Sequence, residues 1–313
     1  MGVFVFLPLV LPLTALPIAR LAEQHLHPRG AALLLTFVSA VLAACSTFCL
    51  ALLMVVGTAQ LPGNPLPDSW SDPEVRDAVP YDEVAGKTAI VALAAVVVAC
   101  AHTVRRHVRF RSRAHRALAG LPADEVAVLD DGLPYAYALP GSPGRIVVSA
   151  GMLSCLNAAE REALLAHERA HLTGRHHLLL LAARLAGCAN PFLLPLRAAI
   201  AYSTERWADE AAAQATGDRR TTARAVGKAA LFARPAPPLT PPPGMAAFAA
   251  AGPVPRRVAA LLGPVPPRRN WPPALTRAGI AAYVAAAGTA ASTMSALNSA
   301  AALFLILEAA TPL

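Results

Sequence analysis

Four long stretches of apolar residues divide the chain. They lie at residues 3–19, within 31–56, at 88–104 and within 278–307. A helix that crosses a bilayer needs roughly 20 such residues, with a range of about 17–25. The first stretch has no charged residue before Arg20, and the third lies between Lys87 and Arg105. The pattern therefore predicts four transmembrane helices.

The charges between these stretches predict the topology. Loop 62–86 carries six acidic residues against one arginine, Arg76, whereas arginines crowd the segment that follows the third stretch. Arginine and lysine are retained on the cytoplasmic side of a membrane. We therefore expect both termini and the acidic loop outside the cell, and segment 105–277 in the cytoplasm. The N-terminus lacks the basic segment of a signal peptide, so we expect it to remain as a helix.

This topology divides the chain into three parts. Residues 1–104 form a three-span membrane region, residues 105–277 a cytoplasmic domain, and residues 278–313 a last span with a short external tail. In the cytoplasmic part, β-rich runs at 125–129, 135–139 and 145–149 alternate with turn signals and predict a small antiparallel sheet.

A helix is expected to follow the sheet, from about Asn157 to Gly174. Asn157 is a suitable N-cap, and Glu160 three residues later completes a capping box. A proline-rich stretch at 234–244 is typical of a linker or loop.

Composition supports a membrane protein and excludes several other classes. The chain is 56% hydrophobic and 15% charged, which leaves too little charge for a wholly water-facing surface. Five scattered cysteines without CxxC spacing argue against a disulfide framework or a cysteine zinc site. The net charge of +8 reflects topology and contact with the lipid bilayer, and we expect no direct nucleic-acid partner.

The expected helix contains the sequence His167-Glu168-Arg169-Ala170-His171, which matches the pattern HExxH. Residues four apart lie on one face of a helix, so the two imidazoles can hold one zinc ion per chain. Glu168 lies beside them and is the candidate catalytic base. The apolar residues before the motif predict a buried helix, where polar side chains need partners.

A hydrolytic zinc site needs a third protein ligand, and two candidates compete. His177 would complete the metzincin pattern HExxHxxGxxH. Glu205, spaced four residues from Asp209 on one helix face, could bind the metal while Asp209 orients a ligand imidazole. We favour Glu205 with Asp209, because the apolar run after His177 is equally compatible with a continuing helix.

Segment 178–202 is apolar enough to resemble a fifth span. If His171 and Glu205 bind the same ion, they lie on the same side of the bilayer. The chain between them therefore crosses the bilayer twice or not at all. Two crossings need about 40 residues, which is more than this interval offers, and charged residues and prolines interrupt it. We therefore expect a buried or bilayer-grazing helical hairpin.

The HExxH segment together with Glu205-Arg206-Trp207-Ala208-Asp209 resembles the gluzincin core of the BlaR/MecR-type membrane metallopeptidases, a core shared with HtpX-type and CAAX-processing enzymes. Residues 145–153 resemble the strand ahead of the active helix in that family. The resemblance implies a mainly α membrane protein with an α+β, zincin-like cytoplasmic domain. Only a short segment follows Leu307, so the external penicillin-binding sensor domain of the antibiotic-sensing members is not expected.

The resemblance also implies an activity, that of a zinc metalloendopeptidase acting on a protein or peptide substrate. The substrate could be a winged-helix repressor of the BlaI/MecI type in signal transduction, or a membrane protein under HtpX-like quality control. A non-catalytic receptor that keeps the fold, and a transporter, are the remaining alternatives. We expect an extended substrate to pair with a strand edge at Tyr135, Ala136 and Tyr137.

Overall fold

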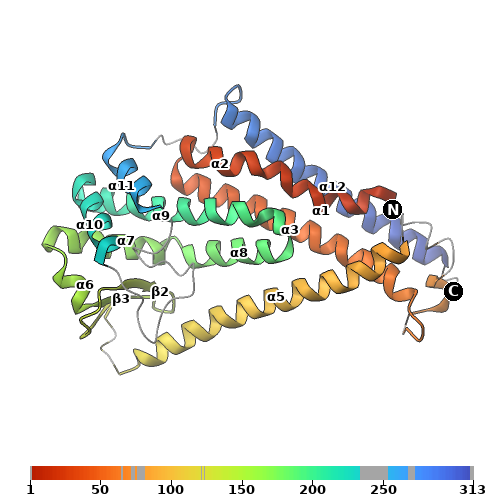
Figure 1. The fold of residues 1–313 in the computed structure, drawn as a ribbon, viewed down its shortest axis with the longest axis horizontal. Helices are drawn as coiled ribbons and strands as arrows, with labels where there is room; N and C mark the ends of the chain where they lie inside the picture. The colour runs from red at the N-terminus through yellow and green to blue at the C-terminus, as the bar shows by residue number, and fades with distance from the viewer. Residues whose placement is uncertain are drawn as a thin grey trace.

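The computed structural model describes residues 2–64, 66–71, 75, 82–120, 122, 124–232, 253–266 and 272–310. It is mostly helical, with a small sheet at one end of an elongated bundle (Figure 1). Both termini lie at the opposite end from the sheet (Figure 1). Much of the acidic loop 62–86 and all of the proline-rich stretch 234–244 lie outside the described residues.

Four helical segments are long and apolar enough to cross a membrane, as the sequence predicts. They are Gly2–His25, Pro28–Ala59, Glu83–Ala117 and Arg277–Ala310. The last three belong to α3 (Pro28–Ala59), α5 (Asp82–Ala117) and α12 (Arg277–Ala310).

The first segment is helical but not one regular helix. It consists of η1 (Gly2–Phe6), α1 (Leu7–Val10), η2 (Leu11–Ala15) and α2 (Leu16–His25). Pro8, Pro12 and Pro17 each stand near the start of one of these pieces. Proline lacks the N–H that continues an α-helix, so the turns tighten locally to the 3₁₀ form.

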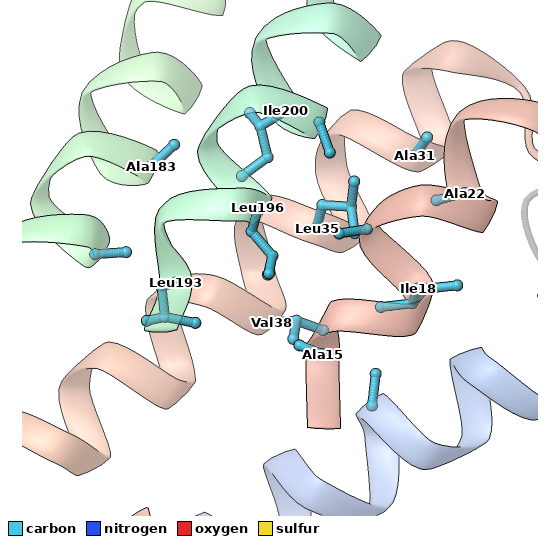
Figure 2. Close-up of a cluster of buried hydrophobic side chains, with 14 of the residues drawn as sticks. Ala15, Ile18, Ala22, Ala31, Leu35, Val38, Ala183, Leu193, Leu196 and Ile200 are labelled. Carbon is cyan, nitrogen blue, oxygen red and sulfur yellow. The ribbon is translucent and has the colours of Figure 1, made fainter. Parts of the chain in front are cut away.

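The apolar segment after the HExxH motif folds into a helical hairpin, as predicted. It comprises α8 (His176–Ala189), η4 (Pro191–Leu193) and α9 (Leu194–Thr216). Asn190 ends α8 in an extended conformation, and Pro191 starts the next helical turn. Figure 2 shows Leu193, Leu196 and Ile200 packed with Ile18 of α2 and Leu35 of α3 in one buried cluster.

The tip of this hairpin reaches well in among the apolar helices. The Asn190 amide donates to the carbonyl of Leu9 at 2.9 Å and to the hydroxyl of Ser46 at 3.0 Å. Ser46 is itself buried near the middle of α3. The hairpin therefore packs inside the bundle and carries α9 back out to the end that holds the sheet (Figure 1).

The sheet has three strands, but it is mixed and not antiparallel, which corrects the sequence prediction. Strands β1 (Val126–Leu129), β2 (Ala136–Leu139) and β3 (Arg145–Ser149) stand in the order β1-β3-β2. β2 and β3 form the expected antiparallel pair, whereas β1 and β3 are parallel. The turn after β1 does not close a hairpin, because β3 takes the place beside β1.

Of the remaining elements, the short 3₁₀ helix η3 (Asp68–Ser71) lies at the far end of the bundle. Near the sheet lie α6 (Ala150–Ser154), α7 (Ala158–Thr173), α10 (Arg219–Phe232) and α11 (Val254–Leu262). One buried cluster joins Val148 of β3, Leu164 of α7, Val226 of α10 and Leu261 of α11. α7 is thereby held between the sheet and the helices that follow it.

Candidate metal centre

Helix α7 carries the HExxH motif and begins where the sequence predicts. The Asn157 side chain accepts from the backbone N–H of Glu160 at 2.9 Å, and the Glu160 carboxylate accepts from the backbone N–H of Asn157 at 3.0 Å. This capping box fixes the first turn. The rest of the helix then points His167, Glu168 and His171 into the protein, each at most 3% exposed.

Helix α9 brings Glu205 to the same point. One Glu205 oxygen lies 3.6 Å from Nε2 of His167, and the other lies 3.6 Å from Nε2 of His171. The two imidazole Nε2 atoms are 3.0 Å apart. Together these residues offer three candidate ligand atoms within 4.8 Å of one another, and all three side chains are buried.

These separations fit zinc. Two ligands placed at 2.0–2.1 Å in a tetrahedral arrangement are about 3.4 Å apart. Two imidazole nitrogens and one carboxylate are also a donor set typical of catalytic zinc. Both oxygens of Glu168 are buried and have no hydrogen-bond partner among the described residues. A polar group that belongs to the working site, such as a water molecule, would satisfy them.

Asp209 lies directly behind His167. One of its oxygens is 3.2 Å from Nδ1 of His167, so a proton on Nδ1 leaves Nε2 free to bind a metal. Burial alone would raise the pKa of Asp209, but the adjacent Arg257 and His167 hold that pKa well below its usual range. Asp209 is therefore an ionised acceptor that fixes the orientation of the imidazole.

Arg257 of α11 is a member of this network that the sequence analysis did not single out. Its guanidinium donates to both oxygens of Asp209, at 2.8 and 2.6 Å, and Nη1 lies 3.0 Å from Glu205. The side chain is fully buried. A sequence signal exists, because Arg257 falls on the same helical face as Val254, Val258 and Leu261, where an arginine needs a buried partner.

Glu168 is the buried carboxylate nearest to the candidate ligands on its own helix. Burial raises the pKa of Glu168 to about 8; His167 and Arg257 oppose this shift, and the negative charge of Glu205 adds to it. The backbone of Ala138 in β2 also acts on this carboxylate. A carboxylate whose pKa lies near neutrality can both take up and return a proton.

His171 has its own supporting residue. Nδ1 of His176 lies 2.8 Å from Nδ1 of His171, and the His176 ring packs on Trp207 with ring centroids 4.4 Å apart. Arg175 adopts a left-handed conformation that turns the chain back, and a side chain at Gly174 would overlap the His176 ring. The conformation of residues 174–176 thus places the His176 ring against His171.

The structure separates His177 from the metal cluster. Its ring stacks on His107 of α5, with centroids 6.2 Å apart and the planes 9° from parallel. The segment containing Tyr135, Ala136 and Tyr137 lies at the free edge of the sheet, because β2 is the last strand in the order β1-β3-β2. Tyr135 and every side chain of β2 are buried.

Comparison with known proteins points to the same segment. Residues 100–200 match the model of peptidase family M48. A protease HtpX homologue of Prosthecochloris aestuarii is 38% identical over 91 residues, which are 28% of this chain and 30% of the relative. One of Pyrococcus abyssi is 42% identical over 72 residues, which are 22% of this chain and 25% of the relative.

These alignments span less than a third of either relative, and no solved structure gives a significant match. The matched segment holds His167, Glu168 and His171, and Glu205 lies five residues beyond its end. Over these residues the chain is similar to peptidase family M48, and the comparisons do not distinguish a BlaR/MecR-type protein.

Proposed function

We propose that the protein is a membrane-embedded, zinc-dependent endopeptidase whose active site lies at the sheet end of the bundle. One observation carries the proposal: three buried donors from α7 and α9 converge within 4.8 Å, beside the buried carboxylate of Glu168. The likeness to peptidase family M48 supports a protease over a receptor or a transporter.

In this proposal His167, His171 and Glu205 hold one zinc ion. When bound, zinc supplies the positive charge that polarises the scissile carbonyl and acidifies the attacking water. Glu168 takes the proton of that water and returns it to the leaving amine. Asp209 holds His167 in the tautomer that leaves Nε2 free, and Arg257 keeps Asp209 and Glu205 in place.

We also propose that an extended peptide pairs with the free edge of β2. The N–H of Ser149 donates to Tyr135 at 3.0 Å, and Tyr137 stands opposite Val147. Alternate residues of an antiparallel strand direct their backbone groups to opposite sides. Ala136 and Ala138 therefore present theirs to the open edge, where a substrate strand could add, and the Ala138 backbone adjoins Glu168.

The substrate class follows from where the site lies. In the topology predicted from the charges, the site is on the cytoplasmic side within domain 105–277, and membrane-associated proteins are the substrates closest to it. The relatives are named as protease HtpX homologues, and an HtpX-like quality-control role is the first candidate. A repressor of the BlaI/MecI type is the second candidate, and it rests on the sequence resemblance alone.

The test exchanges the proposed base and keeps the ligands. Glu168→Gln should retain about one zinc per chain and lose cleavage of a labelled casein by at least about 100-fold, the scale of a general base. Zinc is measured by mass spectrometry and cleavage by fluorescence. Glu162→Gln, the same change at an exposed position of α7, is the matched control and should cleave as the wild type does. Equal cleavage by Glu168→Gln would refute the role of the base.

A further inference from the structure

A group of basic side chains lies between α5 and α8, away from the metal cluster. We call it the α5–α8 cationic cluster, and it consists of His107 and Arg111 of α5 with His177 and Arg184 of α8. His107 and His177 stack, and the charges of Arg111 and Arg184 both act on His107. The two helices also touch through Cys100, whose thiol faces the Leu185 carbonyl at 3.9 Å.

The cluster has polar atoms that nothing in the described chain satisfies. His107 is 4% exposed, and its Nε2 has no hydrogen-bond partner. The same holds for Nε of Arg111 and Nη2 of Arg184, which are also removed from solvent. None of the ion pairs found between described residues involves Arg111 or Arg184.

The neighbouring groups add positive charge and do not balance it. Arg106 and Arg197 act on Arg184, and Arg175 acts on His177. Like charges gathered in a partly buried space repel one another, and each unpaired polar atom there adds a desolvation cost. An anion seated between the two helices would remove both costs.

The position of the cluster indicates which anion. It lies where the apolar part of α5, up to Val104, gives way to the arginine-rich part. Val97 and Val98, on the apolar part, are 57% and 68% exposed, as expected for side chains that face lipid tails. Guanidinium groups bind phosphate through paired hydrogen bonds, and basic pockets beside membrane helices on the cytoplasmic side bind lipid headgroups.

The geometry points to a binding site for a phosphate group in the α5–α8 cationic cluster, supplied by the headgroup of an anionic phospholipid. Arg111 and Arg184 contact the phosphate oxygens, and His107 donates from Nε2. The bound headgroup joins α5 to α8, whose first residue, His176, lies against His171. The lipid thus braces the helix that supports the metal cluster.

The experiment measures lipid binding by the full-length protein in detergent. Purified, lipid-depleted protein is titrated with phosphatidylglycerol, phosphatidylcholine or inorganic phosphate, and the unfolding temperature and the bound lipid seen by native mass spectrometry are recorded. We expect phosphatidylglycerol to bind and to raise the unfolding temperature, and phosphatidylcholine to have little effect. Arg111→Gln with Arg184→Gln should weaken phosphatidylglycerol binding about tenfold or more, the loss expected from charge-assisted hydrogen bonds.

Arg109→Gln with Arg113→Gln is the matched control, because it removes the same charge from exposed positions of α5. It should retain wild-type binding within about twofold. Without lipid, Arg184→Gln should unfold at a higher temperature than the wild type, because it removes an unpaired cation. The direction of this change in unfolding temperature distinguishes a lipid site from a purely structural role of Arg184. In a purely structural role, the substitution would lower the unfolding temperature of the lipid-free protein.

Three results would overturn the proposal. The first is equal loss of lipid binding in the site and control variants, which would indicate a diffuse surface charge effect. The second is a lower unfolding temperature of lipid-free Arg184→Gln. The third is full stabilisation by inorganic phosphate with none by phosphatidylglycerol, which would assign the site to a soluble anion.

Discussion

At the scale of single residues, the metal cluster depends on groups that restrain its candidate ligands from behind. Asp209 holds His167, His176 holds His171, and Arg257 lies against Glu205. Each supporting group comes from a different helix than the ligand it restrains. Restraint of this kind keeps donor atoms in position before a metal binds, and its loss commonly weakens metal affinity 10–100-fold.

The third ligand can be tested at this scale. Glu205→Ala should lose bound zinc and cleavage, because it removes one of the three converging donors. His177→Ala should keep both, because its ring stacks on His107 outside the cluster. Zinc per chain after dialysis is the measurement for each variant. Zinc loss in His177→Ala with retention in Glu205→Ala would instead support the metzincin alternative.

At the scale of elements, close contact between helices organises the apolar bundle. Gly57 of α3 and Gly86 of α5 lie so close that a side chain on either would overlap the backbone of the other. Small residues allow membrane helices to approach in this way, so that van der Waals contact stabilises the pair. α5 also carries His107 and Arg111 of the α5–α8 cationic cluster, so the crossing of α3 and α5 sets the distance of these two residues from the rest of the bundle.

This crossing leads to a stability prediction. Gly57→Ala should destabilise the protein by about 1–3 kcal/mol, the usual cost of forcing an added methyl into a packed contact. Gly120→Ala is the control, because nothing lies within 4 Å of a side chain at that position. Thermal unfolding in detergent compares the two variants. If Gly57→Ala unfolds no earlier than Gly120→Ala, α3 and α5 do not approach as closely as described.

At the scale of the whole molecule, the metal cluster and the termini occupy opposite ends of the bundle (Figure 1). The loop between the first two apolar segments lies at the metal-cluster end. Arg29 stacks over Trp207 at 5.4 Å, and Glu23 pairs with Arg256 at 2.8 Å. The topology that we predict from the charges places the first loop and segment 105–277 on the same side of the membrane, and these contacts between them agree with that prediction.

The orientation itself can be measured with single cysteines in a chain whose five native cysteines are replaced by alanine. A cysteine at Leu61, at the far end of α3, should react with a membrane-impermeant maleimide in intact cells. A cysteine at Arg113, at the sheet end of α5, should react only after permeabilisation. The opposite labelling pattern would place the metal cluster outside the cell.

The sequence by itself determined the features that depend on local spacing. Hydrophobic length gave the four apolar helices, the capping box gave the start of α7, and the HExxH spacing placed two histidines on one helical face. The helical hairpin also followed, because chain length between His171 and Glu205 excludes two crossings. These properties depend on residues that are close together in the chain, so they could be predicted without the fold.

Only the tertiary structure decided which distant groups meet. The sequence left His177 as an alternative to Glu205, and the structure brings Glu205 to α7. The parallel pairing of β1 with β3 and the burial of Arg257 against Asp209 also join residues far apart in the chain. The cationic cluster likewise exists only because α8 folds back along α5. Such contacts depend on how whole elements pack. The packing energy is distributed over many side chains, and the spacing of residues along the chain does not indicate which distant side chains they contact.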